Sequence, residues 1–290
     1  MRKLFLFLLI VALFFGCSKK EHKEVLKIAT NSWIGYTPLF LAKERGILQQ
    51  LDIELLTSSS LAEAMEIFSV QKAQLVTTTQ HEYLALKDEF NIKPIICIDR
   101  SSGGDMILSN KSIAEIKKSS KISVFLEVDS INNELLQTFV QKYKIDPNKL
   151  IIHNIDPSWI ETIKNRPFHS IIIVTYSPYD KPLLKQGFKI VASTKDMNSL
   201  VVIDSICASS DIIAKHSKRL HKLKKVVDMM IQEIQKDPKA AYNTTKQYLQ
   251  NISYKEFLSS LHLIKWINHP DKKILNKMEQ IGYDTSKIIP

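Results

Sequence analysis

Apolar and polar positions first form a strand-like run and then a helix-like run near the start of this chain. Val25–Thr30 is short, apolar and rich in β-type residues, as expected of a strand. The polar and aromatic stretch Asn31–Tyr36 follows as a loop. Thr37 is expected to cap a helix that begins at Pro38, and Gly46 to end it. A strand that leads through a loop into a helix N-terminus is where open α/β sheets bind ligands.

The same alternation of strand and helix is repeated downstream. Strands are predicted at Asp52–Leu56, Gln74–Thr78 and Pro94–Ile98. Helices are expected after the capping sequences Ser60–Glu63 and Thr79–Glu82. This order of elements predicts an α/β fold in which helices cover the faces of a mostly parallel sheet.

The second half of the chain continues the pattern and then becomes helical. Further strands are predicted at Asp105–Asn110, Lys121–Leu126, Leu150–His153, His169–Val174, Lys189–Ser193 and Val201–Ala208. Helices are expected after Ser112, through Leu135–Tyr143, from Ser158 with a capping box to Glu161, at Lys181–Gln186, from Asp211, at Pro238–Leu249 and from Ser253 to Pro270. The tail Lys272–Pro290 shows no clear pattern.

The N-terminus has the layout of an export signal. After a positively charged start, Leu4–Phe15 is an apolar run of twelve residues, shorter than the ~20 that span a bilayer. Gly16 and Cys17 then resemble a bacterial lipobox, although Phe14 replaces the usual aliphatic residue. We expect residues 1–17 to be a signal peptide with a lipidated Cys17, followed by a tether at 18–24. The acyl chains on this cysteine would suffice for stable anchoring.

Charge and cysteine content restrict the classes of function and site that the sequence can indicate. Forty Lys and Arg residues against thirty Asp and Glu give a formal charge of +10. The densest basic cluster, Lys215–Lys225, lies where apolar residues recur at helical spacing, which indicates the solvent face of an amphipathic helix rather than a nucleic-acid site. Cys97 and Cys207 lie in apolar runs and are expected to be buried single thiols, with a disulfide left open. No spacing indicates a metal site, and no cofactor is expected.

The strand-end loops hold the candidate ligand-binding residues. Trp33 and Tyr36 either stack on a ligand or cover the core, and Gly35 between them indicates a close approach or an unusual backbone angle. Two polar loops follow later strands and should face the same crevice. They contain Gln80 in the first loop, and Ser101 and Ser102 in the second. The alternative is that these residues only cap helices and form turns.

The stretch WIGYTPLFLAKERG (Trp33–Gly46) resembles the opening of solute-binding proteins of nitrate, sulfonate, taurine and thiamine-precursor ABC importers. The resemblance extends over Leu26–Leu249. It implies a type II periplasmic-binding-protein fold with two α/β lobes, each a mostly parallel sheet flanked by helices, and two crossing strands as the hinge. Lobe one would comprise 25–109 and 204–290, and lobe two 110–203.

The resemblance also marks positions in the second half. Tyr176 stands where the family has the tryptophan of a Trp-Glu-Pro-Tyr element. Asp129, Ser130 and Asn132 occupy the turn that grips the polar group of a ligand, with Asp129 in place of a glycine. Asp129 would oppose a bound anion, or it merely caps the next helix. Asp204 lies in an apolar run and must therefore be paired or lie at the cleft.

The resemblance implies a lipid-anchored protein on the periplasmic side of a bacterial membrane, without catalysis. It would be a monomer that binds a small polar or aromatic solute and works with ABC permease and ATPase subunits. A sensory lipoprotein is one alternative. Another is an enzyme of thiamine-pyrimidine or menaquinone synthesis, although His81, His153 and His169 fall on separate elements. The charge of the solute stays open, because the basic balance favours an anion whereas the aspartates favour a cation.

Overall fold

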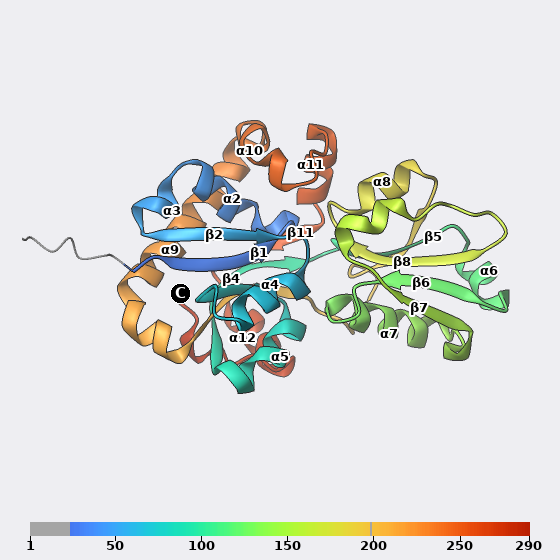
Figure 1. The fold of residues 1–290 in the computed structure, drawn as a ribbon, viewed down its shortest axis with the longest axis horizontal. Coiled ribbons are helices and arrows are strands. Elements are labelled where there is room, and N and C mark those ends of the chain that lie inside the picture. Colours follow the sequence, from blue (N-terminus) through green and yellow to red (C-terminus); the bar gives the residue numbers. More distant parts are fainter. Residues whose placement is uncertain (1–23, 198) are drawn as a thin grey trace, which may run out of the picture.

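The computed structural model describes residues 24–197 and 199–290, which form two α/β lobes side by side (Figure 1). The first lobe is built on a six-stranded sheet with the strand order β11-β4-β10-β3-β1-β2. The second is built on a five-stranded sheet with the order β7-β6-β8-β5-β9. Within these residues, none of the helices has the length and apolar character needed to cross a membrane. The α/β architecture predicted from the sequence is confirmed.

The first sheet combines parallel and antiparallel strands. β1 pairs in parallel with β2 and β3, and β10 runs antiparallel between β3 and β4. Its strands are β1 Leu26–Asn31, β2 Ile53–Ser58, β3 Leu75–Thr78, β4 Ile92–Ser101, β10 Ile203–Ser209 and β11 Ile264–Trp266. Its helices are η1 Ile34–Tyr36, α2 Thr37–Glu44, α3 Ile47–Gln50, α4 Leu61–Ser69, α5 Gln80–Phe90, α9 Ser210–Lys236, α10 Pro238–Thr245, η4 Lys246–Tyr248, α11 Tyr254–Leu261, α12 Lys272–Gln280 and η5 Thr285–Lys287.

The second sheet is also mixed. β6 is parallel to β7 and β8, whereas β5 is antiparallel to β8 and β9. Its strands are β5 Asp105–Ser109, β6 Ile122–Leu126, β7 Leu150–Asn154, β8 Ser170–Tyr176 and β9 Lys189–Ser193. Its helices are α6 Ile113–Lys118, α7 Ile131–Tyr143, η2 Pro147–Lys149, η3 Pro157–Thr162 and α8 Asp180–Lys185.

The chain passes between the sheets in two places within the described residues, from β4 to β5 and from β9 to β10 (Figure 1). The lobe boundary that the sequence placed after Ser109 is wrong, because β5 pairs with β8 and β9 of the second sheet. The chain leaves the first sheet after Ser101 and returns to it at Ile203. Short connections of this kind can serve as a hinge between lobes.

Local capping differs from the prediction at two helices. α2 begins at Thr37 rather than Pro38, and the Thr37 hydroxyl donates to the Ile34 carbonyl at 2.5 Å instead of capping the helix. The expected helix after Ser158 is the 3-10 helix η3, which Asp156 caps by accepting from the backbone N–H of Ser158. Gly46 takes the left-handed conformation after α2, as expected of a residue that ends a helix.

The predictions for the basic helix and for the two cysteines are confirmed. α9 turns Leu223, Val227 and Ile231 into the core, while most of its lysines face solvent. Lys224 is buried, and its ammonium group is held by Asp228 at 2.8 Å. Cys97 and Cys207 are buried free thiols.

Candidate functional site

An aromatic wall lies where the two lobes meet. Trp33 follows β1 and is only 4% exposed. Its ring centroid lies 5.9 Å from that of Tyr176 at the end of β8, with the planes 78° apart. The Tyr176 hydroxyl accepts a hydrogen bond of 2.8 Å from Nδ2 of Asn31, the last residue of β1. The first lobe thus supplies the indole and the amide, and the second lobe supplies the phenol.

Two aspartates of the first sheet hold the aromatic loop. The Trp33 indole N–H points at the Asp99 carboxyl, 3.3 Å from each oxygen, and the Tyr36 hydroxyl donates to Asp204 Oδ1 at 2.6 Å. Asp99 and Asp204 lie opposite each other on the antiparallel strands β4 and β10. Burial raises the pKa of both carboxyls well above the usual range, and the nearby Asp99 raises that of Asp204 further.

Two glycines make room for the indole. A Cβ on Gly35 would lie 1.9 Å from Asp99 Oδ2 and 2.4 Å from Trp33 Nε1. A Cβ on Gly104 would lie 2.3 Å from Trp33 Cη2. Both distances are far below a van der Waals contact. Gly35 is therefore needed for close approach, and the group that approaches it is the Trp33–Asp99 pair.

A small cavity lies beside the aromatic wall. Its volume of about 10 Å³ is close to that of one water molecule. Three acceptor atoms of its lining residues are buried without a hydrogen-bond partner: Asn31 Oδ1, Asp105 Oδ2 and Asp204 Oδ2. The lining residues are Asn31, Trp33, Tyr36, Leu61, Thr79, Asp105, Tyr176 and Asp204. Burial also raises the pKa of Asp105, to about 7.

The lobes are closed over this cavity. The Ala62 backbone N–H donates to Glu127 Oε1 at 2.9 Å, and Tyr179 of the second lobe donates to the Ser59 carbonyl at 2.8 Å. Glu82 of α5 accepts from the backbone N–H of Ile131 in α7 at 3.2 Å. Each of these bonds joins one lobe to the other, so each must break if the lobes separate.

Three residues predicted in the site serve the crossing segments instead. The Gln80 side chain donates to the Val201 carbonyl at 2.9 Å. The Ser101 hydroxyl bonds the Thr194 hydroxyl at 2.8 Å. Ser102 bonds through its backbone N–H to the Leu263 carbonyl at 2.7 Å. These contacts position the hinge rather than the cavity.

The turn before α7 also differs from the expectation. Asp129 is exposed, and the cap of α7 is Ser130, whose hydroxyl accepts from the backbone N–H of Asn132. The interpretation of Asp129 as the cap is therefore wrong. Asn132 is buried, and neither atom of its amide has a hydrogen-bond partner. None of these residues lines the cavity at Trp33.

Sequence reasoning missed Leu61 and Asp105 as lining residues, and it missed Asp99 as the partner of Trp33. It expected the loops of Asn31 and Thr79 at the crevice without selecting these two residues. One signal was available, because Asp99 follows directly on the apolar run Pro94–Ile98. Its side chain is completely buried. An acid at that position must be paired or lie at a cleft, which is the argument that the sequence supported for Asp204.

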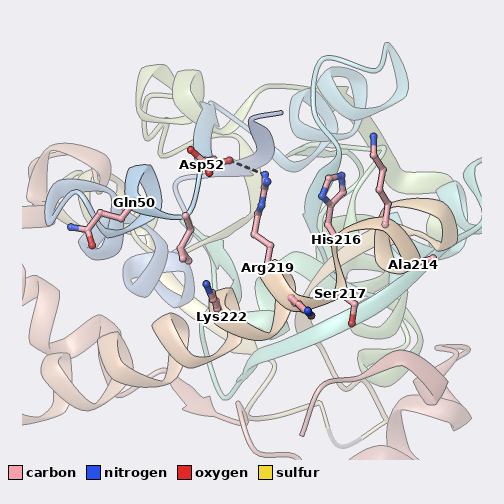
Figure 2. A pocket seen from close by; sticks show the side chains of 10 residues that line it. Gln50, Asp52, Ala214, His216, Ser217, Arg219 and Lys222 are labelled. Carbon is pink, nitrogen blue, oxygen red and sulfur yellow. Dashed lines mark hydrogen bonds between the residues drawn. The ribbon is translucent and has the colours of Figure 1, made fainter. Parts of the chain in front are cut away.

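A larger pocket of about 700 Å³ lies elsewhere on the first lobe. Its wall includes Lys215, His216, Arg219 and Lys222 of α9, and Figure 2 shows the last three of them. Arg219 reaches across the pocket and donates to the Asp52 carbonyl at 3.4 Å. This pocket is wide and basic, and Trp33 is not part of it.

Metal ligands and histidines are not gathered at the cleft. Across residues 24–197 and 199–290, no three His, Cys, Asp or Glu side chains are grouped to hold a metal ion. His81 pairs with Glu134 at 3.0 Å, and this hydrogen bond raises its pKa. His153 is stacked on Phe125 in the second lobe, and His169 is exposed just before β8.

The chain forms two α/β lobes and returns from the second lobe to complete the first. The two lobes close over an aromatic cavity. These features define a periplasmic-binding-protein fold. A ligand-binding component of an ABC-type import system from Staphylococcus aureus is 13% identical with a TM-score of 0.72, over 89% of this chain and 91% of that one. The aliphatic sulphonate-binding protein SsuA from Escherichia coli is 13% identical with a TM-score of 0.70, over 89% and 85%. The nitrate-binding protein NrtA from Synechocystis is 12% identical with a TM-score of 0.64, over 80% and 68%.

The sequence itself gives the family. A family model described as NMT1/THI5 like matches residues 33–241. This match spans more than half of the chain, and the chain belongs to the NMT1/THI5-like family. No curated protein matches the sequence. The matched region begins at Trp33, the residue at the centre of the cleft.

Proposed function

We propose that this chain is the solute-binding protein of an ABC-type importer and captures a small polar or aromatic solute between its lobes. The observation that carries the proposal is the cavity at Trp33 and Tyr176, to which both lobes contribute. It is lined by rings and by unpaired polar atoms, as in other small-molecule sites. Two of the solved proteins with this fold are named for the ligands that they bind, sulphonate and nitrate.

Capture would work by hinge closure. With the lobes apart, Asn31 and Tyr176 would separate and expose the indole of Trp33 to solvent. A solute that met polar atoms of both lobes would favour the closed state, because it would bind that state more tightly than the open one. Permease and ATPase subunits would then take up the solute from the closed form. No residue of the site is assigned a chemical step.

We place the protein on the periplasmic side of a bacterial membrane, as a monomer held by a lipid on Cys17. Cys17 lies outside the described residues, so this part of the proposal is based on the sequence. The apolar run Leu4–Phe15 and the following small residue and cysteine support it. Labelling of the expressed chain with a radioactive fatty acid, compared with Cys17→Ser, tests the anchor. Equal labelling of the two chains would refute it.

The test of solute binding uses Trp33→Ala, with Trp159→Ala as its matched control. Trp159 is 65% exposed on η3 of the second lobe and does not line the cavity at Trp33. We expect Trp33→Ala to weaken binding by at least about tenfold, or about 1.4 kcal/mol, and Trp159→Ala to leave it unchanged. The full chain in detergent is screened by thermal shift against nitrate, taurine, alkanesulfonates, thiamine and its pyrimidine precursors.

Two results would contradict the proposal. The first is equal affinity of Trp33→Ala and the unmodified chain for a solute identified in the screen. The second is conversion of a bound compound into a product, which would indicate an enzyme on the same fold. Mass spectrometry of the compound recovered after incubation distinguishes binding from turnover.

A further inference from the structure

The cleft contains several carboxyl groups without a compensating cation. Asp105 from β5 and Asp204 from β10 line the cavity, and Asp99 from β4 lies opposite Asp204. The buried Glu82 of α5 raises the pKa of Asp105 and of Asp204, and it also raises that of the buried Glu127, which precedes α7. In the described part of the chain, no lysine or arginine is among the groups that shift the pKa of Asp99, Asp105 or Asp204.

The unpaired atoms of the cavity are an amide oxygen and two carboxyl oxygens, and all three are acceptors when the carboxyls are ionised. Asn31 is fully buried, and Asp204 and Asp105 are 3% and 4% exposed. One oxygen of each has no hydrogen-bond partner: Asn31 Oδ1, Asp105 Oδ2 and Asp204 Oδ2. A buried acceptor without a partner destabilises the folded protein, because it has lost its hydrogen bonds to water and gained none in exchange. The three residues line one cavity and come from three strands of both sheets, which indicates a ligand that donates hydrogen bonds.

Several donors that could meet an anion are already engaged. Trp33 gives its indole N–H to Asp99, and Tyr36 gives its hydroxyl hydrogen to Asp204. Thr79 gives its hydroxyl hydrogen to Glu82. A sulfonate or nitrate in this cavity would face carboxyl oxygens without these three donors. Burial of an anion beside these carboxyls is unfavourable wherever they are ionised.

From this geometry we infer that the solute carries a protonated nitrogen, an ammonium-type cation whose N–H groups bind Asn31 Oδ1, Asp105 Oδ2 and Asp204 Oδ2. The inference rests on the proposed solute-binding function. An alkylammonium group has three N–H donors, and the cavity offers three unpaired acceptors. The volume of about 10 Å³ is at the lower limit for a group the size of one water molecule, so only the ammonium head could enter the closed cavity. The rings of Trp33 and Tyr176 offer a cation–π contact and an apolar surface for the rest of the solute.

The protonation state of the cleft carboxyls adds a second observable, the pH dependence of cation binding. Burial raises the pKa of Asp105 to about 7. Burial also raises the pKa of Asp99 and of Asp204 well above the usual range, with a further increase from the nearby Asp105 for Asp99 and from the nearby Asp99 for Asp204. An ammonium group binds best when these carboxyls are ionised. Protons therefore leave the cleft as the cation enters it, and the affinity for the cation rises with pH. The negative charge of Glu82 favours a bound cation in the same way, because it lies near Asp105 and Asp204.

The test compares three probes with the same ring and different head groups: benzylammonium, benzyl alcohol and benzenesulfonate. Calorimetry on the full chain in detergent should show benzylammonium binding at least about tenfold more tightly than benzyl alcohol, and tighter at about pH 8 than at about pH 6. Benzenesulfonate should not bind. A larger space than the present cavity is needed for the ring, so binding includes some opening of the lobes.

Three variants separate a ligand role from a structural one. Asp105→Asn and Asp204→Asn should each weaken benzylammonium binding at least about tenfold and remove part of its pH dependence. Both should melt at the same temperature as the unmodified chain or higher, because each removes a buried acid that repels others. Asp88→Asn, an exposed change on α5, is the matched control and should leave binding unchanged.

The outcomes distinguish this inference from the proposed function. Tighter binding of benzenesulfonate than benzylammonium would overturn the inference and leave solute binding intact. Failure of all three probes to bind, from a chain that carries no copurified nitrogenous cation by mass spectrometry, would also overturn it. Chemical conversion of a probe would instead refute the proposed function. Loss of folding in both aspartate variants would assign Asp105 and Asp204 a structural role and contradict the inference.

Discussion

Gly35→Ala should destabilise the first lobe, because the new Cβ would lie 1.9 Å from Asp99 Oδ2 and 2.4 Å from Trp33 Nε1. The overpacking costs about 1–3 kcal/mol, and loss of the indole–carboxyl hydrogen bond costs about 1 kcal/mol more. Alanine also reduces the conformational entropy of the unfolded chain, which adds about 0.4–1 kcal/mol to the free energy of unfolding. We therefore expect a decrease in the free energy of unfolding of about 2 kcal/mol, measured by urea denaturation.

Gly46→Ala is the control for this change. Gly46 has a φ of 69°, and no atom of the described residues would lie within 4 Å of a Cβ added there, so its substitution strains the backbone without a clash. That strain amounts to about 1 kcal/mol. Gly35→Ala should also shift the tryptophan fluorescence and weaken solute binding, whereas Gly46→Ala should do neither. A free energy of unfolding for Gly35→Ala within about 0.5 kcal/mol of the unmodified chain would refute the reasoning.

Two further predictions concern pH and closure. Burial raises the pKa of Asp105 and of Glu127 to about 7, so the folded chain holds protons that the unfolded chain has lost. The urea midpoint should therefore fall as the pH rises from about 5 to about 8, with a smaller fall in Glu127→Gln; a midpoint that rises over this range would contradict the prediction. Tyr176→Phe removes the bond of 2.8 Å from Asn31. If that bond contributes ~1 kcal/mol, the closed population should decrease by about fivefold relative to the open one, and solution scattering should show a larger radius of gyration than for Tyr143→Phe.

Local sequence signals were sufficient to predict most of the fold. Strands such as Leu75–Thr78 and helices such as Gln80–Phe90 have apolar periods and capping boxes that depend on neighbours in the chain. The chain after Ser253 is different. The prediction of a helix from Ser253 to Pro270 is wrong, because α11 ends at Leu261 and the three-residue strand β11, Ile264–Trp266, follows, fixed by pairing with β4. α12 follows at Lys272–Gln280, and one of its residues is fully buried. Elements stabilised by distant partners leave little periodic signal in their own sequence.

The residues of the candidate site also differ in whether their own segment of the sequence indicates their role. Trp33, Tyr36 and Asp204 could be selected because each is unusual in its own segment, two aromatics in a polar loop and an acid in an apolar strand. The side chains of Ser101 and Gln80 are buried, and both form hydrogen bonds with the crossing segments. That role depends on where the chain returns to the first sheet, which neighbouring residues do not specify. Polar residues at strand ends therefore indicate where the crevice lies. They do not show which of these residues line the cavity and which position the hinge.

The charge of the whole chain does not determine the charge of its solute. The formal charge of +10 favours an anion, but the basic pocket of α9 lies beside Asp52, at the start of β2. The cleft lies near the other end of that strand, where Ser58 pairs with Asn31. Six residues at about 3.3 Å each separate the two by about 20 Å. Salt screens surface charges beyond about 8 Å under physiological conditions. The buried acids of the cleft, which no such screening reaches, therefore decide which head group can enter.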